Sequence, residues 1–301
     1  MSNQDYIENV YQHLSQYKVN KLKIVEDGIY RKNKKPYKHI LPDKEKRLNI
    51  IEPIRDKFWN YFKTTKIKLH TDFHHLNSSQ ALCFNLFYPM INRKEKYLNF
   101  LKEIFECKNN EEDNFDIFFE WVDNFNLMRQ EGIKSHHDVF IDFGKIKYLV
   151  EIKYTEHTDA SCSSSIRNAN CNNNIIDIIN KNLCPLEKDY KTLYMSYLSN
   201  CYDIKKLGSK FKNDCPFNHG EQYQLMRYIE LANLKSTSAE KWIPVIIYPE
   251  KNQFIGKEVE KCKEFLLQNI ELLEITLEQF IDKLELYDPI LSNWLKERYI
   301  I

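Results

Sequence analysis

The stretch SHHDVFIDFGKIKYLVEIKYTE, Ser135 to Glu156, decides the fold. Two apolar runs flank a Gly-Lys pair, and a two-residue loop that begins with glycine predicts a hairpin with a type II′ turn. If Phe143 pairs with Ile146 across this turn, the register places Asp138 opposite Glu151. Residues opposite each other on paired strands share a face of the sheet. The hairpin therefore brings two carboxylates together.

The two faces of this hairpin differ in chemistry. Lys153 lies on the face of Glu151, because side chains two apart on a strand point the same way. The opposite face is apolar and consists of Val139, Ile141, Phe143, Ile146, Tyr148, Val150 and Ile152. We therefore expect one face that packs in a core and one that carries chemistry.

Like charges directly opposite each other destabilise a pair of strands unless a cation lies between them. Mg²⁺ is commonly held by one or two carboxylates and completes its shell with water and substrate phosphate. Lys153 beside it would position or deprotonate the attacking water, or stabilise charge on the phosphate. The Glu-x-Lys triplet alone is not specific, since Glu106 to Lys108 repeats it at the end of an expected helix without an opposing acid. The specific signal is the hairpin register.

Asp138, followed by Glu151, Ile152 and Lys153 on the next strand, resembles the active-site signature of the PD-(D/E)XK nucleases, the restriction-endonuclease-like superfamily. His137 stands in the place of the proline of that name. In this order, HILPDKEKRLNII, NSSQALCFNLF, VEIKYTE and EQYQLMRYIELA resemble a prokaryotic branch of the superfamily, over most of the chain after about His39. The resemblance implies an α/β fold with a restriction-endonuclease-like core of order αβββαβ, in which helices flank a mixed central sheet.

The pattern along the chain agrees with this order. We expect a basic, helical N-terminal extension over residues 1–75, with helices at 3–17 and 43–62, and a nuclease domain over residues 76–301. In that domain we expect a helix from Ser78 or Ser79 that Pro89 interrupts, and a second one over 94–105. Strands are expected at 115–122, 137–143, 146–154 and 241–249, and later helices at 220–234, 257–269, 277–286 and 289–299.

Further residues are candidates for the site. Alternation on the strand 115–122 places Glu120 on the face opposite Phe119 and Trp121, where it would reach the metal or remain an exposed edge carboxylate. Gln80 and Asn85 are polar in an otherwise apolar helix, which indicates either buried hydrogen bonding or support of the site. We favour support over a direct role in the chemistry.

Gln224 and Tyr228 lie four apart and hence on one side of their helix, with Arg227 beside them. They resemble the Gln/Tyr motif that follows the lysine in the exonuclease-like branches, where it helps to hold the substrate strand or the site. An amphipathic helix with an ordinary polar stripe is the other interpretation.

Net charge is +1, but basic residues outnumber acids between Lys18 and Arg47. Lys32, Lys34 and Lys35 in YRKNKKPYKH would contact a phosphate backbone or belong to a solvated surface loop, and the sequence favours neither interpretation over the other.

Other metal chemistry is disfavoured by spacing. Cys162, Cys171, Cys184, Cys201 and Cys215 with His219 contain no CxxC pair, so a zinc or iron–sulfur site is a minor alternative. His70, His74, His75, His136 and His137 match no ligand motif for a histidine–metal nuclease. A chain with six glycines and no glycine-rich phosphate loop does not indicate an NTP-driven motor. The Ser- and Asn-rich segment 157–174 is expected to be a loop after the catalytic strand.

Composition favours a cytoplasmic enzyme, because there is neither an apolar run of membrane-spanning length nor a signal-peptide pattern. The resemblance implies a Mg²⁺- or Mn²⁺-dependent nuclease that leaves 5′-phosphates, and DNA is the expected substrate. Restriction or antiphage defence is an expectation by analogy of fold. The alternatives are an RNA nuclease and a catalytically silent nucleic-acid-binding subunit of a larger assembly. A homodimer and a partner protein of a defence system both remain open.

Overall fold

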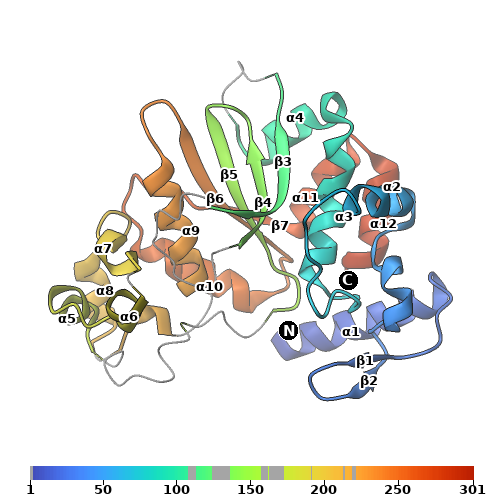
Figure 1. Cartoon of the computed structure of the whole chain (residues 1–301), viewed down its shortest axis with the longest axis horizontal. Coiled ribbons are helices and arrows are strands. Elements are labelled where there is room, and N and C mark those ends of the chain that lie inside the picture. The colour runs from blue at the N-terminus through green and yellow to red at the C-terminus, as the bar shows by residue number, and fades with distance from the viewer. Residues whose placement is uncertain are drawn as a thin grey trace.

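The computed structural model describes residues 3–107, 113–123, 136–156, 162, 173–190, 192–212, 214–218 and 222–301. A sheet of order β3-β4-β5-β6-β7 runs through its centre (Figure 1). Its strands are β3 (Asp116–Val122), β4 (His136–Asp142), β5 (Ile146–Ile152), β6 (Lys241–Tyr248) and β7 (Leu273–Thr276). The first three strands are antiparallel, whereas β6 and β7 run parallel to β5, so the predicted mixed sheet is confirmed.

Helices cover both faces of this sheet (Figure 1). One layer contains α1 (Asn3–Asn20), α2 (Arg55–Phe62), α3 (Ser79–Ile91), α4 (Lys94–Ile104), α11 (Leu277–Glu285) and α12 (Pro289–Tyr299). The other contains α5 (Ile175–Asn180), α6 (Pro185–Tyr190), α7 (Tyr194–Leu198), α8 (Ile204–Lys210), α9 (Gln222–Lys235) and α10 (Gln253–Phe265). The order α3, β3 to β5, α9, β6 is the expected αβββαβ core. Among the residues described, every helix is too short or too polar to cross a membrane.

The β4–β5 hairpin has the predicted register. Phe140 pairs with Leu149, and the loop between the strands contains Gly144 with φ of 86°, as a type II′ turn requires at its first central residue. The prediction of a single core face is wrong, however. Phe140 and Leu149, on the face of the carboxylates, are buried in an apolar cluster with residues of α9 and α10. Both faces are packed because helices cover the sheet on each side.

The regular alternation of β3 ends at Glu120. This residue has φ of 50°, in the left-handed region that non-glycine residues rarely adopt. Phe119 packs on Phe84 of α3, whereas the ring of Trp121 lies 5.0 Å from that of Phe140 on the other face. The prediction that Phe119 and Trp121 share a face is therefore wrong, and the backbone of Glu120 is the physical reason.

The extension also differs from the prediction of a single helix over 43–62. The structure has a 3-10 helix (Asp43–Asn49), an extended break, a second 3-10 helix (Glu52–Ile54) and then α2. Pro53 explains the break, since proline has no N–H to donate inside a helix. Pro89, by contrast, lies inside α3 without ending it. Strand β7 and a hairpin of β1 (Gly28–Tyr30) and β2 (Lys35–Tyr37) were not expected.

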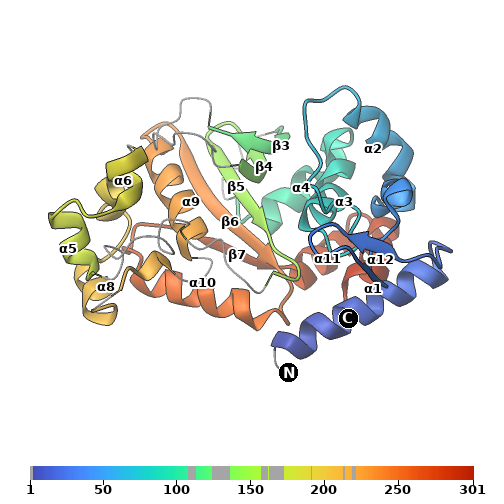
Figure 2. The same ribbon diagram turned by 60° about the horizontal axis from the view of Figure 1, so that its bottom comes forward.

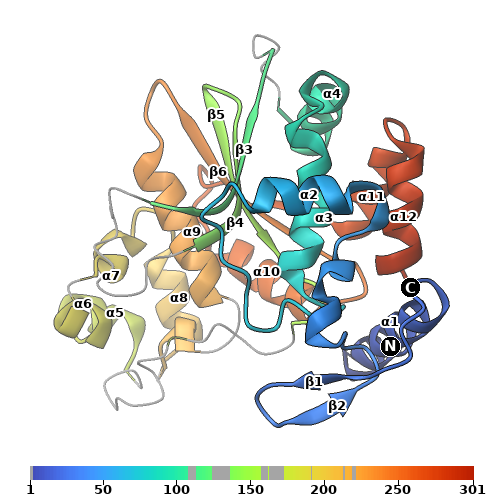
Figure 3. The same cartoon turned by 45° about the vertical axis from the view of Figure 1, so that its right-hand side comes forward.

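Helix α1 lies along α12 (Figure 2), and its Tyr6, Val10 and Leu14 belong to the same apolar cluster as α3 and α11. The β1–β2 hairpin projects beside α1 (Figure 3). The extension and the sheet thus share one core, and the boundary at residue 75 stays a prediction.

Candidate active site

The candidate site lies where β4 begins and β5 ends, with α9 against one side. Glu151, near the end of β5, is 6 % exposed. Its Oε1 accepts a hydrogen bond of 2.6 Å from Nε2 of Gln224, and its Oε2 accepts one of 2.5 Å from the hydroxyl of Tyr228. Gln224 also donates to the Tyr228 hydroxyl over 2.9 Å. The two α9 residues that helical spacing placed together thus orient the carboxylate.

Lys153 follows β5 directly and is buried beside Glu151. Its Nζ lies 3.1 Å from Oε1 of Glu151 and donates to Oε1 of Gln224 over 2.8 Å. Gln224 therefore bridges the lysine and the carboxylate through the two ends of one amide. This arrangement holds the ammonium group in place before any substrate arrives.

Asp138 lies at the other side of this group. The strand ladder ends at Val139 with Val150, and continuing its register places Asp138 opposite Glu151. Oδ2 of Asp138 accepts a hydrogen bond of 2.8 Å from the backbone N–H of Ile152. Burial and the neighbouring charge of Glu151 raise the pKa of Asp138 well above its ordinary value, against the lowering effect of the Ile152 N–H. The site therefore holds a carboxyl group whose ionised form is costly without a cation.

Glu120 completes a row of acids across three strands. Pairs on both sides of it keep one register, which places Glu120 opposite Asp138. Its Oε1 accepts a hydrogen bond of 2.6 Å from Gln80 in the first turn of α3 and lies 3.8 Å from Nε2 of His70. Nδ1 of His136 lies 3.9 Å from its Oε2. Glu120 is thus not an exposed edge carboxylate, since its side chain is only 14 % exposed.

Of the two polar residues of α3, one supports the site and one does not. Gln80 holds Glu120 and accepts from the backbone N–H of His70, as support of the site requires. Asn85 bonds instead to Ile51, Asn49 and Tyr299, far along the chain from any site residue. For Asn85 the first of the two alternatives, buried hydrogen bonding, therefore holds, because it satisfies buried backbone groups of the extension.

His137 occupies the position before Asp138 and is fully buried against the ring of Tyr228, with 4.1 Å between ring centroids. Burial, and then the charge of Arg227, lower the pKa of His137 to about 3. The imidazole is therefore neutral at physiological pH and packs beneath the side chain that orients Glu151.

The donor set suits a hard divalent cation. Asp138 and Glu151 supply carboxylate oxygens, and Mg²⁺ typically binds one or two carboxylates while keeping water and phosphate in its other positions. Among the residues described, no three His, Cys, Asp or Glu side chains are arranged to hold a metal ion. The zinc, iron–sulfur and histidine–metal alternatives gain no support from them, and Cys171 and His219 lie outside the described residues.

The predicted substrate-binding residues fall into two groups. The guanidinium of Arg227 lies over the rings of Tyr223 and Tyr194, at 5.3 and 6.0 Å, on the α9 side. Lys32, Lys34 and Lys35 lie in the exposed β1–β2 hairpin. The hairpin contacts the loop before α3 through the rings of Tyr30 and His75, and among the described residues none of its contacts reaches the carboxylates.

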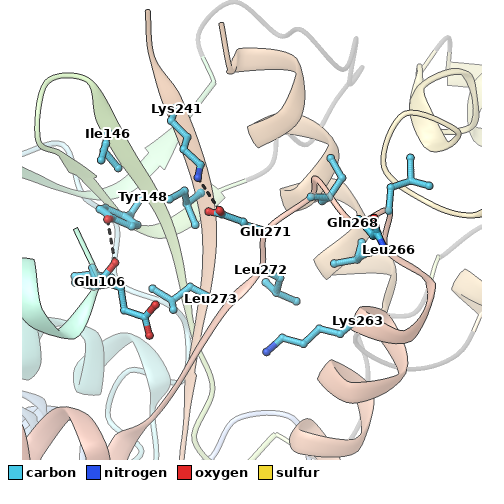
Figure 4. Close-up of a pocket in the computed structure, with 14 residues that line it drawn as sticks. Glu106, Ile146, Tyr148, Lys241, Lys263, Leu266, Gln268, Glu271, Leu272 and Leu273 are labelled. Atoms are coloured by element: carbon cyan, nitrogen blue, oxygen red, sulfur yellow. Dashed lines mark hydrogen bonds and ion pairs between the residues drawn. The ribbon is translucent and has the colours of Figure 1, made fainter. Parts of the chain in front are cut away.

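A cavity of about 580 Å³ lies elsewhere, lined by Ile146, Tyr148, Lys241, Glu271 and neighbours (Figure 4). Ile146 begins β5, about 16 Å along the strand from Glu151 at 3.3 Å per residue. An ion pair of 2.7 Å between Lys241 and Glu271 lies in its wall. This cavity is therefore separate from the candidate site.

Sequence reasoning considered His70 and His136 only for a histidine–metal site. It did not place them beside Glu120, which they approach from the loop before α3 and from β4. No local pattern marks either residue, because both contacts join segments far apart in the chain.

Comparison with known proteins gives one match. The family model described as "Restriction Endonuclease associating with ARP" matches residues 11–300. Neither the curated proteins nor the solved structures contain a match. The family match confirms the resemblance to restriction-endonuclease-like nucleases, and the structure has the sheet and flanking helices expected of them. The chain belongs to the family of restriction endonucleases associating with ARP.

Proposed function

We propose that this protein is a metal-dependent nuclease that hydrolyses phosphodiester bonds in DNA, with Asp138 and Glu151 as ligands of Mg²⁺ or Mn²⁺. The observation that carries the proposal is the group of Asp138, Glu151 and Lys153 at one end of the sheet, with the pKa of Asp138 raised by burial and by Glu151. A structural ion pair would not place a second carboxylate against the first. Membership of a restriction endonuclease family supports the same activity.

Each residue of the site has a distinct role in the proposed reaction. Gln224 and Tyr228 fix the carboxylate of Glu151, and Gln224 fixes the ammonium of Lys153. Lys153 is the group that would orient the attacking water and balance charge developing on the phosphate. Glu120, held by Gln80, adds negative charge beside Asp138 and strengthens the preference for a cation. A bound Mg²⁺ or Mn²⁺ supplies Lewis-acid polarisation and lowers the pKa of a bound water.

Defence is the proposed setting, and ARP is the proposed partner, because the family description names that association. The lysines of the β1–β2 hairpin and Arg227 are proposed contacts to the phosphate backbone, where each would contribute a salt-sensitive share of affinity.

Cleavage is expected to require a divalent metal. Purified protein, alone and with its partner, is incubated with supercoiled plasmid, linear duplex, single-stranded DNA and structured RNA, in Mg²⁺, Mn²⁺ or EDTA. We expect DNA to be cut in either metal, with 5′-phosphate ends, and to stay intact in EDTA. Cutting of RNA alone would favour the RNA nuclease. Metal-independent binding without any cutting, with the partner present, would favour the silent binding subunit.

Replacing Gln224 by methionine is expected to lower the cleavage rate by about 10–100-fold, the usual cost of removing a residue that orients a metal ligand. The variant keeps the size of the side chain but breaks the bridge between Lys153 and Glu151. The matched control is Gln253→Met, at an exposed position of α10. Equal rates for the two variants would remove Gln224 from the site.

A further inference from the structure

A second cavity, of about 350 Å³, lies next to the carboxylates. The loop before α3, the first turn of α3 and the residues just after Lys153 line it, among them His70, Asp72, His75, Asn77, Ser79 and Thr155. His70 joins it to the site, since its Nε2 lies 3.8 Å from Oε1 of Glu120. Tyr11 of α1 forms part of the wall, so the N-terminal extension helps to build this cavity.

Polar atoms that make no hydrogen bond within the described part of the chain gather in its wall. Oδ1 of Asn77 is buried and accepts no hydrogen bond within the described part of the chain. Oδ1 of Asp72 and Nε2 of His75 face each other over 3.6 Å, too far apart for a hydrogen bond, and neither atom makes one elsewhere in that part. The orientation of Asn77 is fixed, because its Nδ2 donates to Oγ1 of Thr155 over 2.8 Å. A buried polar group without a hydrogen bond destabilises the protein, so the unbonded oxygen of Asn77, beside the loosely paired Asp72 and His75, points to a bound group.

The chemistry of these atoms selects the ligand. The oxygens of Asp72 and Asn77 are acceptors, so they call for a ligand that carries N–H or O–H donors. Burial lowers the pKa of His75 to about 4, so this residue brings no positive charge at neutral pH. Asp72 and Glu156 add negative charge, which disfavours a bare phosphate and favours the donor-bearing edge of a nucleobase.

The size and position of the cavity narrow the choice of ligand. A cavity of about 350 Å³ is near the lower end of the range of about 300–1,000 Å³ for small-molecule sites, which suits one nucleotide and excludes a base pair. The basic β1–β2 hairpin is attached at its rim, with the rings of Tyr30 and His75 5.3 Å apart. A strand entering here would keep its phosphates near Lys32, Lys34 and Lys35.

We propose that this cavity receives one unpaired nucleotide of the substrate strand and reads its base through Asp72 and Asn77. The inference rests on the proposed function for the statement that this strand is the one cleaved. The N-terminal extension would then give the enzyme a preference for single strands, or for duplex sites where a base leaves the stack.

Binding of mononucleotides tests the cavity without cleavage. Titration of metal-free protein with dGMP and dTMP, followed by NMR or calorimetry, should show tighter binding of dGMP, whose pairing edge carries more donors. Asp72→Asn should weaken dGMP binding by about tenfold, the loss of a hydrogen bond to a charged acceptor. Asn77→Ala should act in the same direction. The control Asp56→Asn, at a side chain that is 94 % exposed, should bind as wild type does.

Cleavage of a single-stranded oligonucleotide relative to a blunt duplex gives a second measurement, in which Asp72→Asn should reduce the preference for the single strand. If dGMP binding depends on Asp72 but the protein cuts no nucleic acid, the nucleotide site in the cavity is supported and the proposed nuclease activity is contradicted. The opposite result is cleavage that depends on Lys153 while Asp72→Asn alters neither dGMP binding nor strand preference. That result would overturn the proposed nucleotide site and leave water as the occupant of the cavity.

Discussion

Replacing Lys153 by methionine is expected to reduce the rate of DNA cleavage by about 10³-fold, within the range found when a group that stabilises the transition state or transfers its proton is removed. The side chain is 9 % exposed, and its Nζ is held by Glu151 and Gln224 at 3.1 and 2.8 Å. Methionine fills a similar volume but brings no charge and no donor. The loss should therefore appear in kcat more than in the affinity for DNA.

The measurement compares single-turnover rates of Lys153→Met and wild type, with circular dichroism and urea unfolding to check the fold. The control is Lys241→Met, on the neighbouring strand β6, whose exposed lysine pairs with Glu271. Lys153→Arg restores the charge with a different shape, so it should recover only part of the rate. If folded Lys153→Met cut DNA within a few fold of wild type, the chemistry would have to lie elsewhere in the chain.

Local periodicity explains what could be predicted at this site. Alternation along β4 and β5, together with Gly144 at the turn, fixes the register and hence the meeting of Asp138 with Glu151. Helical spacing likewise places Gln224 beside Tyr228 on α9, and both contact Glu151 in the structure. In each case the elements are regular, so positions two or four apart determine which side chains share a face.

Irregular backbone and distant contacts explain what could not be predicted. The positive φ of Glu120 reverses the faces of β3, and nothing in a period of two signals such a residue. Phe140 and Leu149 are buried because helices far along the chain cover that face of the sheet. The contacts of Glu120 with Gln80 and His70 join a strand to the helix α3 and to the loop before it, both at least 40 residues earlier in the chain. Tertiary packing, and not local pattern, determines these features.

Asp138→Asn is expected to abolish metal-dependent cleavage and at the same time to stabilise the metal-free protein, by about 1–2 kcal/mol at neutral pH. Burial, Glu151 and Glu120 all raise the pKa of this carboxyl group, so its ionised form opposes folding when no cation is bound. The amide keeps an oxygen that can accept the hydrogen bond from the Ile152 N–H but carries no charge.

The pH dependence of the stability difference between wild type and the Asp138→Asn variant follows from the raised pKa of Asp138. Because the pKa of Asp138 is higher in the folded than in the unfolded state, wild type loses stability as pH rises from the unfolded pKa through the raised folded one. The advantage of the asparagine variant should therefore be absent in acid and grow over that interval. Asp142→Asn, on the same strand but at the turn, is the matched control and should show no such gain.

Added metal should make wild type more stable than the Asp138→Asn variant. Mg²⁺ or Mn²⁺ that binds only the folded wild type stabilises it by mass action, whereas the variant has lost one of two ligands and should respond weakly. Urea unfolding at several metal concentrations measures both effects in one series. An asparagine variant that is less stable than wild type in EDTA would mean that Asp138 is a structural acceptor for Ile152. If Asp138 serves to bind a cation, the asparagine variant should be more stable than wild type in EDTA and less stable than wild type in Mn²⁺.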